Sequence, residues 1–254
     1  VKLAGQYCLI TNRCQFEGLV LTVAYYHMVA SVLRHFLVKF LKRFFKAKSV
    51  NLLKVEVAQR FKMSTAPPPP KPPSQHNLVW IDLEMTGLNV ETDRIIEIAC
   101  IVTNKNLDVL ERGPDVVIHE PAEVMEAMNE WCKVNHAKTG LTQAVADSKV
   151  TLAEAEQQVL DFVKRHCPEK ACPLAGNSIY MDRMFLNRYM PRLNDYLHYR
   201  IVDVSTIKEV CKRWNGSIFS HAPPKKLAHR ALEDIEESIK ELKYYKQYMF
   251  QGSR

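Results

Sequence analysis

One stretch of the sequence decides the fold: Leu78-Val79-Trp80-Ile81-Asp82-Leu83-Glu84-Met85-Thr86-Gly87-Leu88. It is an apolar run with two carboxylates set into it, and its length is typical of a buried strand in a sheet covered on both faces. Because side chains alternate along a strand, Asp82 and Glu84 point to the same face near its end. Two such carboxylates repel each other, so either one keeps a proton or a cation lies between them. A divalent metal ion is the simpler explanation; a strand end in solvent, with both acids exposed, is the alternative.

The charge of the chain is unevenly distributed. The net charge is +7, but residues 1–77 carry twelve Lys or Arg against two acids, whereas the remainder carries 23 basic and 26 acidic residues. The part that contains the strand is therefore slightly acidic, which argues against a long electropositive groove for nucleic acid. The seven cysteines are scattered without a Cys-x-x-Cys pair. They are expected to be reduced thiols of an intracellular protein.

Residues 1–62 form a basic segment that we expect to lie outside the fold. The uncharged stretch at 18–33 has 16 residues, fewer than the roughly 20 that a membrane span needs, so no stable membrane association is expected. The basic amphipathic pattern at 34–46 is typical of a mitochondrial presequence. The alternative is that residues 1–62 are not native coding sequence, since Met63 would serve as an ordinary start. We expect a mitochondrial location, a cytoplasmic one, or both.

The rest of the chain divides into a linker, a folded domain and a short tail. Residues 63–76 are rich in proline, which favours polyproline II and a spacer role. Residues 77–250 carry the periodic patterns of a folded domain, and 251–254 are the tail. After the first strand, the pattern predicts strands at 94–103 and 110–119, which would form an antiparallel meander with it.

The second half of the domain alternates helices with short strands. Helical periodicity covers 123–135 and 151–166, and Thr151 with Glu154 forms a capping box that opens the second helix. The remaining elements are predicted as a strand at 172–176, a helix at 181–190, a strand at 199–203 and helices at 205–213 and 230–248. The fold class is therefore α/β, with a mixed central sheet flanked by helices.

Three more titratable residues lie near the starts of predicted helices. Asp182 alone would be a first-turn acid that complements the helix dipole. His229 alone would be a surface or satisfied histidine. Helical spacing pairs His229 with Glu233 and not with Asp234, so spacing leaves open which of these two acids belongs with the histidine.

Three segments of the sequence form an ordered set: Trp80 to Leu88, Ala175-Gly176-Asn177-Ser178 followed by Asp182, and His229-Arg230-Ala231-Leu232 followed by Asp234. Taken in order, they resemble the exonuclease motifs of the DEDDh 3′-to-5′ exonucleases and, more narrowly, of the oligoribonuclease family. The resemblance covers about residues 77–250 and implies an RNase H-like αβα fold. Ala228 departs from the pattern, because relatives usually have Ser or Thr before the histidine.

The resemblance also implies a reaction. Two Mg²⁺ or Mn²⁺ ions would be held by four acids, with His229 as general base: Asp82, Glu84, Asp182 and Asp234. Carboxylate oxygens suit these ions, and ions roughly 3.5–4 Å apart stabilise both the attacking and the leaving oxygen. Dinucleotides and very short single-stranded RNA would be hydrolysed from the 3′ end to nucleoside 5′-monophosphates. The alternatives are an exonuclease of the same fold for longer RNA or DNA, and a catalytically silent nucleic-acid-binding module.

Two apolar positions match family residues that bind bases. The resemblance implies that Leu88 wedges between the two bases of a dinucleotide and that a base stacks on Trp131, an interaction that tolerates any sequence. The alternative for both residues is ordinary core or surface packing.

Five further positions match a family site that caps the substrate. The resemblance implies that Ser178, Arg200 and Ser205 bind the 5′ phosphate, and that His136 and Tyr199 come from the partner subunit. It therefore implies a homodimer with shared active sites. The alternatives are an ordinary strand end for Tyr199 and Arg200, and a helix cap for Ser205.

Overall fold

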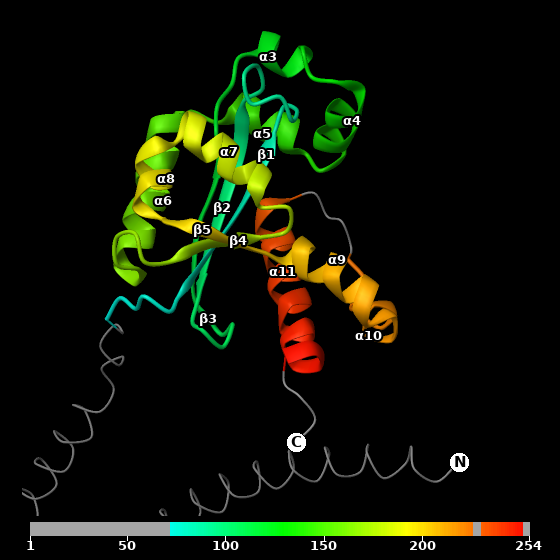
Figure 1. Ribbon diagram of the computed structural model, residues 1–254. Coiled ribbons are helices and arrows are strands. Elements are labelled where there is room, and N and C mark those ends of the chain that lie inside the picture. Colours follow the sequence, from blue (N-terminus) through cyan, green and yellow to red (C-terminus); the bar gives the residue numbers. More distant parts are fainter. Residues whose placement is uncertain (1–71, 226–229, 251–254) are drawn as a thin grey trace, which may run out of the picture. The chain divides into compact units, whose positions relative to one another are not determined.

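The described part of the computed structural model comprises residues 72–225 and 230–250, in which helices cover both faces of one mixed sheet (Figure 1). The predictions for 1–62, for linker residues 63–71 and for the tail at 251–254 fall outside the described residues, as do Ala228 and His229. The proposed domain boundaries stay predictions.

The sheet has the predicted meander followed by parallel strands. Its members are β1 (Leu78–Met85), β2 (Ile95–Thr103), β3 (Val109–Val117), β4 (Pro173–Gly176) and β5 (His198–Asp203). Their order across the sheet is β3-β2-β1-β4-β5. The pairs β1–β2 and β2–β3 are antiparallel, whereas β1–β4 and β4–β5 are parallel. The central place of β1 explains why its sequence is a nearly continuous apolar run.

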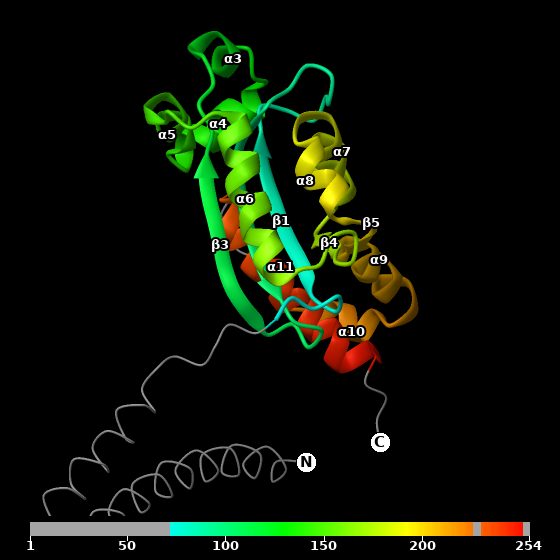
Figure 2. The same cartoon turned by 90° about the vertical axis from the view of Figure 1, so that its left-hand side faces the viewer.

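Alternation along β1 sends its side chains into two different cores. Ile81 and Leu83 face the core beneath α6 (Leu152–His166), α7 (Tyr180–Tyr189) and α8 (Pro191–Tyr196). Trp80 faces the core beneath α9 (Val204–Trp214) and α11 (Ala231–Tyr245). Figure 2 shows α6 and α11 on opposite sides of the strands. Asp82 and Glu84 alternate in phase with Trp80, so they point towards α11.

The helix predicted at 123–135 is two helices in the structure. These are α3 (Ala122–Glu126) and α4 (Glu130–Lys138). The break occurs because the Asn129 side chain accepts a hydrogen bond from the Cys132 N–H (3.0 Å) and caps the second helix. A further helix, α5 (Leu141–Asp147), follows Gly140, whose φ of +78° suits glycine.

The longer helices α6, α7, α9 and α11 follow the predictions closely, whereas α8 lies in a segment for which no element was predicted. Thr151 caps α6 with the capping box formed. A short helix, α10 (Gly216–Ser220), lies in a segment predicted as loop, and α11 continues as a π-helix, η1 (Lys246–Phe250). Among the residues described, no helix combines the length and the apolar character that crossing a membrane requires. The uncharged stretch at 18–33 lies outside that set.

Candidate active site

Three of the predicted acids meet where β1 ends. Carboxylate oxygens of Asp82, Glu84 and Asp234 all lie within 4.8 Å of one another. The first two residues come from β1, and Asp234 comes from the first turn of α11. The strand register shifts between Glu84 and Met85, a bulge of the kind that re-aims side chains beside active sites. The Glu84 side chain is 14% exposed, so the alternative of two solvent-exposed acids is wrong.

The fourth acid, Asp182, is tied to the same strand by a backbone contact. Its Oδ1 accepts a hydrogen bond from the Leu83 N–H at 3.0 Å, and the residue is 6% exposed. This contact is possible because β4 pairs with β1 only at Val79 and Trp80. The Leu83 N–H is therefore not used by β4, and α7 can place the Asp182 side chain there. Leu83 lies between Asp82 and Glu84, and Asp182 is thereby held beside both.

Gly176 ends β4 at the point where the chain must come close to β1. A Cβ atom there would lie 2.7 Å from Ile179 Cδ1 and 3.2 Å from the Ile81 carbonyl oxygen. Both distances are tighter than ordinary packing, so glycine fits this position and a larger residue would push the segment away from β1. The glycine of the second motif is thus needed to place α7 and Asp182.

Burial makes the ionised form of these acids costly. It raises the pKa of Asp82 well above its ordinary value, and the nearby Asp182, Glu84 and Asp234 add to this. Burial, followed by the charges of Glu97 and Asp234, raises the pKa of Glu84 to about 8. Burial also raises the pKa of Asp182 to about 7, against the hydrogen bond from Leu83. The cluster therefore needs either protons or a cation at neutral pH.

Within the described ranges, the two basic residues whose charges act on this cluster are paired with other carboxylates. Arg230, whose charge lowers the pKa of Glu84, forms an ion pair with Glu97 (Nη2 to Oε1, 2.7 Å). Lys225, whose charge lowers the pKa of Asp82, lies 3.2 Å from Glu241 Oε2. A set of clustered carboxylate oxygens is the kind of hard-ligand site that suits a divalent metal ion.

The position of His136 corrects one prediction. The residue is 1% exposed, and its Nε2 lies 3.0 Å from the Met85 carbonyl oxygen, to which Nε2–H donates. Its Nδ1 lies 3.9 Å from Glu84 Oε2 of the same chain. Packing of α4 against the end of β1 buries the imidazole within its own subunit, so the expectation that His136 reaches a partner's site is wrong. The imidazole of His136 is therefore a neighbour of Glu84 in the same subunit.

Leu88 and Trp131 are both presented to solvent. Leu88 is 66% and Trp131 60% exposed, so neither is a core residue. The loop that carries Leu88 is built around Asp93, which accepts hydrogen bonds from Thr86 Oγ1 (3.1 Å) and the Asn89 N–H (2.8 Å). This loop therefore holds a large apolar side chain outside the core, an arrangement that favours contact with a ligand.

The structure brings together the two serines predicted to bind phosphate. Ser178 Oγ and Ser205 Oγ are 3.2 Å apart, and both residues line a groove of about 440 Å³. Ser178 has a φ of +49°, a conformation that costs a non-glycine residue of order 1 kcal/mol or more. Asp203, and not Ser205, is the N-cap of α9. The helix-cap alternative for Ser205 is therefore wrong.

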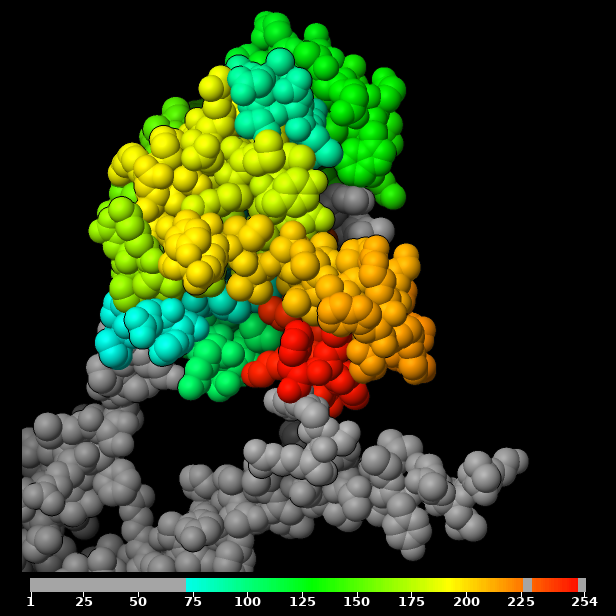
Figure 3. Space-filling model, viewed as in Figure 1, coloured from blue at the N-terminus to red at the C-terminus, as the bar shows by residue number. Residues whose placement is uncertain are grey.

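Tyr199 and Arg200 lie on β5, at the edge of the sheet. Tyr199 is 72% exposed, and the Arg200 guanidinium lies 5.0 Å from the centre of its ring. The space-filling view shows the β5 region at the surface between α8 and α9 (Figure 3). An edge strand with an exposed aromatic and a cation is available to a second chain.

Sequence reasoning missed Glu97. Helical spacing alone left the acid at 233 or 234 open, whereas the family motifs named Asp234. Asp234 belongs to the cluster, whereas Glu233 is exposed. Glu97 is fully buried and lies opposite Glu84 in the β1–β2 register. An acid inside an apolar strand, Ile95-Ile96-Glu97-Ile98, is the same signal that singled out Asp82 and could have identified it.

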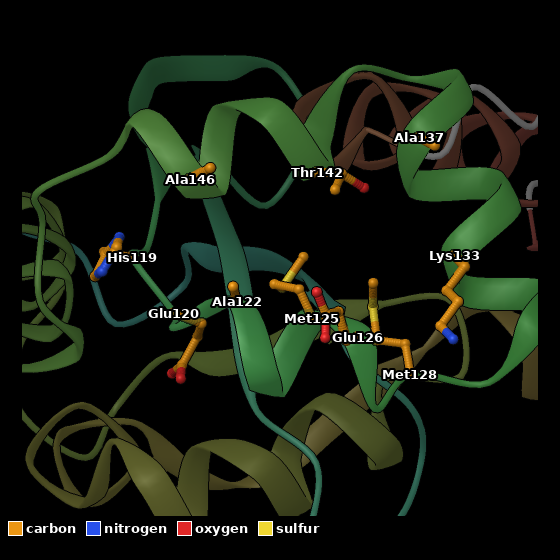
Figure 4. Close-up of a pocket in the computed structure, with 10 residues that line it drawn as sticks. All are labelled: His119, Glu120, Ala122, Met125, Glu126, Met128, Lys133, Ala137, Thr142 and Ala146. Atoms are coloured by element: carbon orange, nitrogen blue, oxygen red, sulfur yellow. The ribbon is translucent and has the colours of Figure 1, made fainter.

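A separate cavity lies among α3, α4 and α5 and does not include the acids. Its volume is about 650 Å³, and its lining includes Met125, Met128 and Thr142. Figure 4 shows the two methionines facing this space. None of the predicted site residues is among those that line it. The cavity is therefore distinct from the acid cluster.

Known proteins resemble this chain over the whole region that forms the site. Residues 79–242 match the Exonuclease (RNase T) family. The chain is 51% identical to the mitochondrial oligoribonuclease of Homo sapiens over 173 residues, which are 68% of this chain and 73% of that protein. The chain belongs to the oligoribonuclease family. The oligoribonuclease of Chromobacterium violaceum is 50% identical over 173 residues, 95% of its length. Membership of the oligoribonuclease family confirms the predicted enzyme class, a hydrolytic exoribonuclease.

Solved structures share the fold of this oligoribonuclease-family chain. Exonuclease I from Methylocaldum szegediense has a TM-score of 0.54 at 18% identity, and the match covers 69% of this chain and 41% of that one. The zinc-bound complex of E. coli exonuclease I with single-stranded DNA has a TM-score of 0.54 at 17% identity, covering 70% and 42%. These similarities concern the fold alone, and they confirm the RNase H-like α/β class.

Proposed function

We propose that this enzyme hydrolyses dinucleotides and other very short single-stranded RNA from the 3′ end, with two Mg²⁺ or Mn²⁺ ions, and releases nucleoside 5′-monophosphates. One observation carries the proposal: Asp82, Glu84 and Asp234 converge at the end of β1, where Leu83 holds Asp182. Half of the residues of the aligned region are shared with oligoribonucleases, which supports this substrate class.

The mechanism assigns a task to each residue of the motifs. Asp82, Glu84, Asp182 and Asp234 would hold the ions with carboxylate oxygens. When bound, the ions supply positive charge where negative charge develops on the scissile phosphate and the leaving oxygen. His229 would take the proton of the attacking water as general base. Its neighbour in the sequence, Arg230, forms an ion pair with Glu97 (2.7 Å).

The exposed apolar residues would set the substrate length. Trp131 offers a stacking surface, and Leu88 stands on its loop as a wedge between two bases. Ser178 and Ser205, with their hydroxyl groups 3.2 Å apart, would bind the 5′ phosphate together with Arg200. A 5′ phosphate bound there would close the site after two nucleotides. A longer RNA would place its third nucleotide at the serines, where the phosphate would otherwise bind. His136 would act within its own subunit, behind Glu84.

We propose that the enzyme is a homodimer that shares residues across β5. The exposure of Tyr199 on an edge strand supports this. A mixture of two impaired variants tests the idea, because a heterodimer of Tyr199→Ala and Asp82→Asn chains has one site with both residues intact. Recovery of activity on mixing is the expected result. Additive residual activity, with monomers in sedimentation, would contradict the proposal.

The deciding experiment is nucleotide release from 5′-phosphorylated RNA of two, five and twenty residues and from a DNA dinucleotide, with Mn²⁺ or with EDTA. We expect Mn²⁺-dependent release that is fastest for the RNA dinucleotide. Preference for the longest RNA, or for DNA, would favour a general exonuclease of this fold. No release from any of the four would leave a binding module as the better description.

The compartment is a separate proposal. The human, bovine and mouse relatives bear the name mitochondrial oligoribonuclease, and residues 1–62 have the composition of a presequence. We therefore propose mitochondrial import. N-terminal sequencing of the endogenous protein tests it: an end within the basic segment or the linker, with a longer precursor, is expected. A protein that starts at Met63 without a precursor would contradict import.

A further inference from the structure

Among the residues described, two buried carboxylates outside the acid cluster hold cations whose charges act on it. Glu97 is 0% and Glu241 2% exposed. Glu97 lies on β2 and binds Arg230; Glu241 lies on α11 and binds Lys225. Arg230 and Lys225 are the residues that border the segment at 226–229 in the sequence. Both carboxylates can therefore keep Arg230 and Lys225 from pairing with the acids of the cluster.

Glu97 is bound more completely than a simple ion pair requires. Its Oε1 accepts from Arg230 Nε (3.0 Å) and Nη2 (2.7 Å), and its Oε2 lies 3.3 Å from the Ala231 N–H at the start of α11. Directly opposed residues in an antiparallel pair have side chains on the same face, so Glu97 is the cross-strand neighbour of Glu84. If Glu97 did not bind it, the Arg230 guanidinium could therefore pair with Glu84.

Glu241 is arranged in a similar way on the other side. Its Oε2 lies 3.2 Å from Lys225 Nζ and 3.4 Å from Asn177 Nδ2. Its Oε1 accepts a hydrogen bond from the Tyr245 hydroxyl (3.3 Å) and lies 3.8 Å from Lys208 Nζ. Asn177 belongs to the second exonuclease motif, Ala175-Gly176-Asn177-Ser178, which is followed by Asp182. Glu241 follows Asp234 by seven residues, about two turns of α11, so the two carboxylates lie on the same face of that helix. Because the Lys225 ammonium group also lowers the pKa of Asp82, a Lys225 released by Glu241 would compete for that carboxylate.

We propose that Glu97 and Glu241 are positioning residues that retain Arg230 and Lys225, so that Glu84 and Asp82 stay available to the divalent ions. The inference rests on the proposed function, because it takes the acid cluster as the metal site. It assigns to Glu97 and Glu241 no contact with the metal or the substrate. Partners of this kind, next to metal ligands, typically change metal affinity by about 10- to 100-fold.

Mn²⁺ binding to the full chain without substrate tests the proposal, by calorimetry and by the electron paramagnetic resonance of free Mn²⁺. Glu97→Gln and Glu241→Gln should each weaken binding about tenfold or more, while kcat at saturating Mn²⁺ stays near that of the parent. The double variant Glu97→Gln/Arg230→Gln should bind Mn²⁺ more tightly than Glu97→Gln alone, since the competing cation is gone. A purely structural role predicts that the double variant is no better.

The matched control is Glu236→Gln. It breaks the Arg112–Glu236 pair (2.9 Å), which also joins α11 to the sheet but has side chains that are 58% and 34% exposed. Mn²⁺ affinity should not change. Thermal unfolding with EDTA shows whether each variant is folded; if Glu97→Gln is not, Glu241→Gln carries the test. Parent-like Mn²⁺ affinity in a folded variant overturns the inference. If the parent itself binds no Mn²⁺, the proposed metal site fails first, and the two failures are thereby distinguished.

Discussion

The acid cluster and the exposed apolar pair Leu88 and Trp131 differ in burial, and each departs from what its chemistry favours. Asp182 is 6% exposed, although it carries a carboxylate, whereas Leu88 is 66% and Trp131 60% exposed, although they are apolar. Without a ligand, a carboxylate is usually exposed and a large apolar side chain usually buried, so both groups are in unfavourable environments. A cation would relieve the first arrangement and a pair of bases the second. The difference teaches that both groups gain from a ligand: the buried carboxylates from a cation and the exposed apolar side chains from an apolar surface.

The sharpest test removes one member of the cluster. Asp82→Asn should lower kcat by about three orders of magnitude, because metal ions contribute several kcal/mol to stabilising the transition state. It should also raise the melting temperature in EDTA, since a buried carboxylate that its neighbours repel is gone. Nucleotide release and thermal unfolding measure the two effects. A variant with near-parent activity would overturn the assignment.

The second test concerns pH and the cost of the buried acids. Because the pKa values of Asp82, Glu84 and Asp182 are raised in the folded protein, it binds more protons than the unfolded chain between about pH 4 and pH 8. The free energy of unfolding in EDTA should therefore fall as the pH rises through this window, by up to about 1.4 kcal/mol per pH unit for each such group.

Mn²⁺ should reverse this trend, because it binds the ionised acids and stabilises the folded state more at pH 8 than at pH 5. Thermal unfolding at both pH values, with EDTA and with Mn²⁺, gives the four measurements that are needed. Asp82→Asn is the control and should show a weaker pH dependence. Equal or greater stability at pH 8 in EDTA would contradict the proposed cost of the acids.

The third test addresses the predicted phosphate cap. Arg200→Ala should lower kcat/KM for 5′-phosphorylated dinucleotides by about 10- to 100-fold, since a hydrogen bond to a charged group contributes roughly 1.5–3 kcal/mol. Dinucleotides without a 5′ phosphate should be cleaved at nearly the parent rate. Equal losses for both substrates would show that Arg200 does not act through the phosphate.

The smallest effects are expected from the apolar surface. Trp131→Ala should raise KM for a dinucleotide about tenfold with little change in kcat, because a stacked base contributes roughly 1–3 kcal/mol. Leu88→Ala should do the same and also relax the preference for two nucleotides. Both side chains are exposed, so melting temperatures should stay within about a degree or two of the parent. A large loss of stability would indicate packing instead.

The sequence predicts those features that depend on neighbours along the chain. The β1 strand follows from an apolar run with alternating acids, and α6 follows from Thr151 and its capping box. The break between α3 and α4 could also have been predicted, because Asn129 is a good N-cap residue. It was missed because the helical periodicity continues on both sides of Asn129. For β1, the spacing also gives the face on which Asp82 and Glu84 lie.

Contacts between distant segments could not be predicted from the residues alone. The bond between Asp182 and the Leu83 N–H joins residues 99 positions apart, and it depends on where β4 stops. The burial of His136 depends on how α4 packs against Met85. Spacing on a helix could not choose between Glu233 and Asp234, because the choice depends on which side of α11 faces β1. The family motifs supplied the set of acids, and the structure supplies the reasons that they meet.

The early end of β4 has a consequence for how this protein can change. If β4 were two residues longer, its backbone would pair with β1 near Leu83, and the sheet would gain hydrogen bonds and regularity. That same pairing would take the N–H that now holds Asp182. A more regular sheet is therefore incompatible with this acid site. Mutations that extend β4 should be stabilising and inactivating at once, so selection for activity keeps an imperfection at the centre of the fold.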